Sequence, residues 1–67
     1  MISICLNGNK FVMKHSMSVQ DLLEYLQVPL HLVTIEYNAQ LLPKNQWASV
    51  MIQANDHMEI ITFVPGG

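Results

Sequence analysis

The chain has 67 residues, a net charge of −2, 51% hydrophobic residues and only 12% charged residues. That length fits one small domain, and the hydrophobic content excludes a disordered chain. Soluble domains usually carry about 25% charged residues, so we expect some apolar surface to stay exposed for a partner protein.

The cations are three lysines with no arginine, which argues against a nucleic-acid ligand and against an anionic membrane surface. No apolar run approaches the roughly 20 residues that span a bilayer, and the N-terminus lacks the features of a signal peptide. Cys5 is the single cysteine, so an internal disulfide cannot form. We therefore expect a reducing compartment: the cytoplasm, or the plastid stroma if the protein is organellar.

The N-terminal residues predict a β-hairpin. Residues 2–6 alternate apolar and polar side chains, which indicates a strand with one buried face. Asn7-Gly8 predicts a tight turn, because both residues tolerate a positive φ. Residues 10–14 are expected to return as a second strand, with Phe11 and Met13 on one face.

A helix is predicted from Ser18 onward. The Ser18 hydroxyl can accept a hydrogen bond from the backbone N–H of Asp21. In return, the Asp21 carboxylate can accept from the backbone N–H of Ser18, which completes a capping box. Pro29 prevents the helix from continuing. Four apolar residues at helical spacing give one buried stripe, namely Val19, Leu22, Leu23 and Leu26.

The second half of the chain predicts three more strands, at residues 32–38, 40–42 and 58–64. Turns are expected at Asn38-Ala39 and Asn55-Asp56, with a loop or a single helical turn over residues 43–50. Residues 58–64 are apolar on nearly both faces, which is typical of a central strand covered on both sides.

One amphipathic helix can cover one face of one sheet. The order of elements therefore predicts an α+β fold of the β-grasp, or ubiquitin-like, type: a mixed sheet of four to five strands with one main helix packed on one face. The first and last strands are expected side by side. We expect residues 1–64 to form this domain and residues 65–67 to form a flexible C-terminal tail.

The predicted tail is Pro65-Gly66-Gly67. Glycine has no Cβ and fits a narrow channel, and Pro65 favours an extended backbone. Three extended residues reach about 10 Å, which is enough to enter the active site of another protein. The tail by itself does not distinguish a reactive end from a frayed one.

Motifs spread along the chain carry a family resemblance: Asn38, Pro43-Lys44-Asn45-Gln46-Trp47, Asn55-Asp56, Glu59-Ile60 and Gly66-Gly67. Together they resemble the ThiS family, the sulfur carrier proteins of thiamine biosynthesis, over the whole length. Two positions depart from the family pattern. Asn55 stands where Gly is usual, and Pro65 replaces a residue that is often Gly or Ala.

The resemblance implies a carrier and not an enzyme. A ThiF-like adenylating enzyme would join AMP from ATP to the carboxylate of Gly67, which is a poor electrophile by itself. A sulfur donor, such as a cysteine desulfurase system, would turn the acyl-adenylate into a thiocarboxylate. A ThiG-like thiazole synthase would then use that sulfur to build the thiazole ring. The carrier would bind no permanent cofactor and supply no catalytic side chain.

The last strand also predicts a docking surface. If Met58 and Ile60 point into the core, then Ile61 and Phe63 face away from the helix. With Val64, these two residues would form an apolar patch that leads to the tail. The alternative is that loops cover both side chains in the monomer.

Three other functions stay open: a sulfur carrier similar to the molybdopterin synthase small subunit, a ubiquitin-like protein modifier, and a small enzyme with Cys5 as nucleophile. Cys5 has no histidine or second cysteine nearby in the sequence, so an idle thiol is expected.

No metal site is expected, because His15, His31 and His57 lack the spacing of metal ligands. Trp47 is expected to cover the sheet edge.

Overall fold

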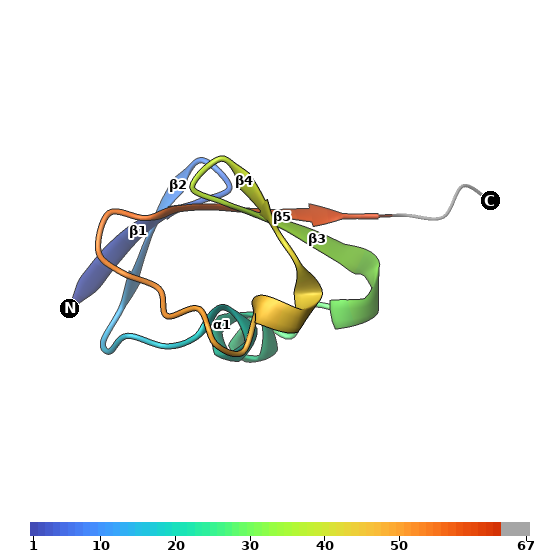
Figure 1. Cartoon of the computed structure of the whole chain (residues 1–67). Helices are drawn as coiled ribbons and strands as arrows, with labels where there is room; N and C mark the ends of the chain where they lie inside the picture. The colour runs from blue at the N-terminus through green and yellow to red at the C-terminus, as the bar shows by residue number, and fades with distance from the viewer. Residues whose placement is uncertain (64–67) are drawn as a thin grey trace.

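The computed structural model describes residues 1–63. These residues form one five-stranded sheet with the order β2-β1-β5-β3-β4, in which β1 and β5 are parallel and the other neighbours are antiparallel. The helix α1 lies across one face of this sheet (Figure 1). The predicted β-grasp fold is therefore confirmed. The elements are β1 (Ile2–Leu6), β2 (Asn9–Met13), α1 (Val19–Tyr25), β3 (Val33–Tyr37), β4 (Gln40–Leu42) and β5 (His57–Thr62), with short 3-10 helices at Leu30–Leu32 and at Lys44–Gln46. The second of these is the single helical turn that was one of the two expectations for residues 43–50.

The predicted hairpin is present, with a second function for its turn. Asn7 and Gly8 both have a positive φ, of 49° and 81°, and Leu6 pairs with Asn9 across them. The Asn7 side chain also donates to the carbonyl oxygen of Ile60 at 3.1 Å and accepts from the Ile60 N–H at 2.6 Å. It therefore ties the hairpin to β5, which extends the short parallel pairing between β1 and β5.

All four N–H groups at the start of α1 have hydrogen-bond partners. The Ser18 hydroxyl accepts from the Asp21 N–H at 3.0 Å, as predicted, and the Ser18 carbonyl oxygen accepts the next N–H. The first two N–H groups donate to the carbonyl oxygens of Val50 and Trp47, each at 3.0 Å. The long loop before β5 therefore completes the cap. The predicted second bond of the capping box, from the Ser18 N–H to the Asp21 carboxylate, does not occur among the described residues.

α1 ends at Tyr25, before the chain reaches Pro29. Gln27 adopts a left-handed φ of 60°, and its N–H donates to the carbonyl oxygen of Glu24 at 3.1 Å. The next N–H, of Val28, donates back to Leu23 at 3.2 Å. These two bonds form a Schellman motif, so the backbone at Gln27 ends α1 before the proline is reached.

β5 takes the central position that was predicted, but the expectation that both its faces are covered is wrong. Met58 is 1% exposed and faces the core, whereas Ile61 is 43% exposed on the opposite face. The physical reason is the single helix, which can cover only one face of the sheet. The other face of β5 therefore stays open in the described chain.

The core lies between α1 and the sheet. It consists of Ile4, Met13, Val19, Leu22, Leu23, Ile35, Trp47, Ile52 and Met58. Ile52 belongs to the loop before β5, where its N–H donates to Met17 and its carbonyl oxygen accepts from Ser16. Within residues 1–63, no helix is long and apolar enough to cross a membrane.

Candidate functional site

The end of β5 lies next in sequence to the predicted reactive tail. The strand runs through the middle of the sheet, and its last residue, Thr62, pairs with Val33 at the beginning of β3 (Figure 1). Phe63, the residue after the strand, still donates its backbone N–H to the carbonyl oxygen of Leu32 at 2.6 Å. This bond anchors the backbone at the point from which residues 64–67 follow.

Ile61 and Phe63 form an exposed apolar patch on the face opposite α1, which we call the β5 patch. Phe63 is 66% exposed. A loop packed over this large apolar side chain would remove most of its surface from water, so the exposure shows that no loop covers it. The prediction that both side chains face away from the helix is confirmed, and the alternative that loops cover them is wrong. Their role in binding a partner stays a prediction.

Carboxylates lie next to the β5 patch. On the neighbouring strand β3, Thr34 pairs with Ile61 and Glu36 pairs with Glu59. Like charges directly opposite each other in a sheet repel, so a cation placed near this pair would be favoured. The open face of the sheet therefore offers apolar contact at the end of β5 and negative charge beside it.

Four of the predicted site residues lie outside the described residues. They are Val64 of the docking patch, Pro65 and Gly66 of the tail, and Gly67, which is the predicted attachment point for sulfur.

Two motif residues that are distant in sequence, Asn38 and Asp56, meet at the beginning of β5. The Asn38 side chain donates to the Asp56 carboxylate at 3.3 Å and accepts from the His57 N–H at 2.8 Å. The Tyr37 hydroxyl donates to the same carboxylate. Asn55 has a φ of 70°, which asparagine tolerates. This network fixes where β5 begins, so these motif residues position the strand that leads to the tail.

The network also shifts two pKa values. Burial and the hydrogen bond to Asp56 raise the pKa of Tyr37 to about 12. For Asp56, burial would raise the pKa, but hydrogen bonds from Tyr37, from the Gln53 backbone and from Asn38 outweigh it and hold the pKa below the ordinary 3.8. Asp56 is therefore an ionised acceptor at neutral pH that stabilises the turn before β5.

Trp47 has the structural position that was expected. Its side chain is 2% exposed, and its Nε1–H donates to the carbonyl oxygen of Leu42 on the edge strand β4 at 3.1 Å. Lys44 Nζ lies 5.9 Å from the centroid of the indole ring, within the range of a cation–π contact. The Pro-Lys-x-x-Trp motif therefore closes the β4 side of the domain.

Cys5 has neighbours that its position in the sequence did not indicate. In the sheet it pairs with Lys10 on β2 and with His57 on β5, and the three residues line a shallow hollow of about 300 Å³. His57 is distant from Cys5 in the sequence, as noted above, but lies beside it in the sheet. The expectation of an idle thiol stays a prediction, and a nucleophilic Cys5 stays its alternative. Within residues 1–63, no group of three or more potential metal ligands occurs.

Known proteins resemble this chain over nearly its full length. The model of the ThiS family matches residues 3–67. An uncharacterized protein called ycf40 from Porphyra purpurea is 42% identical over 66 residues, which cover 98% of this chain and 93% of the relative. A protein named thiazole synthase from Paramagnetospirillum magneticum is 33% identical over 66 residues, 98% of this chain but only 20% of that longer protein.

A solved structure shares the fold. The crystal structure of the thiamine biosynthesis protein ThiS from Geobacter metallireducens matches with a TM-score of 0.87 and 26% identity, and the match covers 98% of this chain and all of that one. The chain described here belongs to the ThiS family, whose members are small ubiquitin-like sulfur carriers of thiamine biosynthesis.

Proposed function

We propose that this ThiS-family chain carries sulfur as a thiocarboxylate on Gly67 and delivers it for thiazole formation. The observation that carries the proposal is the extent of the family match, which runs through Gly66-Gly67 to residue 67. The β5 patch supports it, because an exposed apolar surface just before these residues in the sequence would let an enzyme grip the carrier beside its reactive end.

The chemistry proceeds in two steps on the Gly67 carboxylate. An oxygen of the carboxylate attacks the α-phosphorus of ATP in a ThiF-like enzyme, which forms the acyl-adenylate and releases pyrophosphate. A sulfur nucleophile from the donor then attacks the carbonyl carbon, and AMP leaves. If the sulfur arrives as a persulfide, a thiol reductant supplies two electrons to free the thiocarboxylate. The product ends in a sulfur nucleophile, whereas the carboxylate offered only oxygen.

The carrier needs no catalytic side chain for this chemistry, because the adenylating enzyme activates the carboxylate. What it must supply is a firmly held exit point and a surface to bind. The hydrogen bond from Phe63 to Leu32 provides the first, and the β5 patch provides the second. Glu36 and Glu59 next to it favour a partner whose apolar contact surface has basic residues at its rim.

A ThiG-like thiazole synthase is the proposed acceptor of the sulfur. The relative from Paramagnetospirillum magneticum bears the name thiazole synthase and contains a segment similar to this whole chain within a protein about five times as long. Linking two proteins in one chain raises their effective concentration for each other. We take this arrangement as support for a carrier and synthase that act together.

We propose the plastid stroma as the location, and the relatives named ycf40, which come from plastid genomes, support this over the cytoplasm. A carrier similar to the molybdopterin synthase small subunit would use the same Gly67 chemistry and differ only in the enzyme that accepts the sulfur. A ubiquitin-like modifier would instead leave conjugates that survive strong reductant and denaturant, because an isopeptide bond is not reduced by thiols.

The proposal is tested by reconstitution. The chain is incubated with ATP, a ThiF-like enzyme, a ThiG-like synthase with its small substrates, and a sulfur source, and thiazole product is measured. We expect deletion of Gly67 to abolish product and Cys5→Ser to leave it unchanged. Product that survives loss of Gly67 but disappears with Cys5→Ser would overturn the carrier function in favour of an enzyme with Cys5 as nucleophile.

A further inference from the structure

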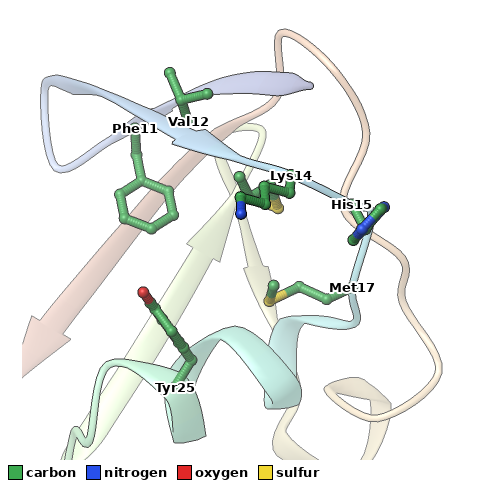
Figure 2. Close-up of a pocket in the computed structure, with 7 residues that line it drawn as sticks. Phe11, Val12, Lys14, His15, Met17 and Tyr25 are labelled. Atoms are coloured by element: carbon green, nitrogen blue, oxygen red, sulfur yellow. The ribbon is translucent and has the colours of Figure 1, made fainter.

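A groove of about 440 Å³ lies between the outer edge of β2 and the helix α1. Its wall includes Phe11, Met13, Lys14, His15, Met17 and Tyr25, and we call it the edge groove. Figure 2 shows the Phe11 and Tyr25 side chains pointing towards each other across it, while Val12 points to the opposite side of the strand. Tyr25 is 71% exposed, so the groove is open to a ligand.

The backbone of β2 offers free hydrogen-bonding groups along this groove. The Cys5 N–H donates to Asp56 at 2.9 Å and therefore points away from β2. The pair of Cys5 with Lys10 is thus not hydrogen-bonded, and by the alternation of antiparallel strands neither is the pair of Ser3 with Val12. The N–H and C=O groups of Lys10 and Val12 consequently point outward, away from β1, where an added strand would meet them.

The charges at the edge groove have one sign. Among the residues that line it, Lys14 and His15 are the ionisable bases, and none is a carboxylate. Lys10 and Lys14 are two of only three lysines in a chain of net charge −2, and they lie on either side of Val12. The edge of β2 is therefore a local basic site on an acidic protein.

These charges disfavour a second copy of the chain as the occupant. If two β2 strands paired antiparallel about Val12, Lys10 of each copy would lie opposite Lys14 of the other. Like charges directly opposite each other are destabilising, and lysines on an edge strand commonly prevent such pairing. The same lysines attract a strand that carries carboxylates.

We propose that the edge groove binds an extended segment of a partner protein in which apolar residues alternate with polar ones and acidic residues follow. The segment adds to β2 as a further strand through the outward backbone groups of Lys10 and Val12. Alternate apolar side chains enter the groove between Phe11 and Tyr25, and the carboxylates lie against Lys14 and His15. This surface is distinct from the β5 patch, because β1 separates β2 from β5 in the sheet.

The test uses the full chain, labelled with ¹⁵N, and a synthetic peptide in which valine alternates with serine and aspartates follow. We expect saturable shifts in the amide signals of β2 and of Tyr25, together with slower hydrogen exchange at the Lys10 and Val12 amides. A matched peptide with lysines in place of the aspartates should bind at least about fivefold more weakly, since exposed ion pairs contribute up to about 1 kcal/mol each.

Two variants separate strand addition from simple apolar contact. Val12→Pro removes an outward N–H without breaking a bond to β1, which an edge strand tolerates, and should weaken binding about tenfold. Val12→Ala keeps that N–H and should bind nearly as the parent does. Equal affinity of Val12→Pro and Val12→Ala would overturn the proposal. Shifts confined to β5, or a dimer in sedimentation that Val12→Pro abolishes, would overturn it as well.

Discussion

The backbone N–H of Phe63 donates to the carbonyl oxygen of Leu32 at 2.6 Å, and this bond joins the residue after β5 to the residue before β3. The bond holds the backbone of an aromatic residue that keeps 66% of its side chain exposed. An anchored backbone under an exposed apolar side chain suits a surface that a partner enzyme must recognise in one orientation. It also fixes the position from which the sequence leads to Gly67.

Phe63→Ala should weaken binding of a ThiF-like or ThiG-like partner about tenfold while leaving the fold intact. The side chain is mostly exposed, so its removal costs little folding energy, whereas an apolar anchor in an interface commonly contributes more than 1 kcal/mol. Calorimetric titration and thermal unfolding measure the two effects. Met51→Ala is the control, because Met51 is a half-exposed apolar side chain beside Ser18 at the start of α1, outside both proposed docking surfaces. A Phe63→Ala chain that fails to fold would refute the docking function.

Asp56→Asn should lower stability by about 1 kcal/mol at pH 7. Because hydrogen bonds hold the folded-state pKa of Asp56 below 3.8, the ionised carboxylate favours folding at pH values above 3.8. This contribution is lost as the pH falls through the lowered folded-state pKa. Urea unfolding at a series of pH values should show the two proteins converging in strong acid. A stability difference that does not change with pH would contradict the assignment.

Trp47→Phe should cost about 2 kcal/mol of unfolding free energy. The change removes the Nε1–H donor, which leaves the Leu42 carbonyl oxygen without that bond, and it also leaves unfilled volume in the core. Chemical denaturation measures the loss. Unfolding midpoints that coincide with the parent would show that Trp47 does not stabilise the β4 edge.

Gln27→Gly should raise stability by about 0.5–1 kcal/mol. Gln27 has a φ of 60°, which costs a residue with a Cβ about 1 kcal/mol and costs glycine little. Gln27→Ala, which keeps the Cβ, should not show the gain. If glycine and alanine at this position have the same effect in thermal unfolding, the positive φ at the end of α1 does not cost the folded state free energy.

Local periodicity predicted most of the fold. Alternation located β1 and β3, helical spacing located α1, and Asn7-Gly8 located the hairpin. Local patterns could not show which residues that are distant in the sequence come into contact. Ile52 is a core residue in an irregular loop, where no period marks it. Cys5 meets His57 only because β1 and β5 are neighbours in space.

The candidate site divides in the same way. Alternation along β5 was enough to predict that Ile61 and Phe63 face away from the helix. The expectation that both faces of β5 are covered failed because a strand can be apolar on a face that its own domain leaves open. The two hydrogen bonds between the Asn7 side chain and the Ile60 backbone were also not predicted. Nothing in the sequence shows that the side chain of a turn residue binds a distant strand.

Intact mass spectrometry can detect the proposed thiocarboxylate on Gly67 itself. The chain is incubated with ATP, a competent ThiF-like enzyme and a sulfur source, and then fragmented to locate any change. We expect a mass gain equal to the replacement of one oxygen by sulfur, confined to Gly67 and dependent on ATP. No gain with a competent enzyme, or a gain located on Cys5, would contradict it.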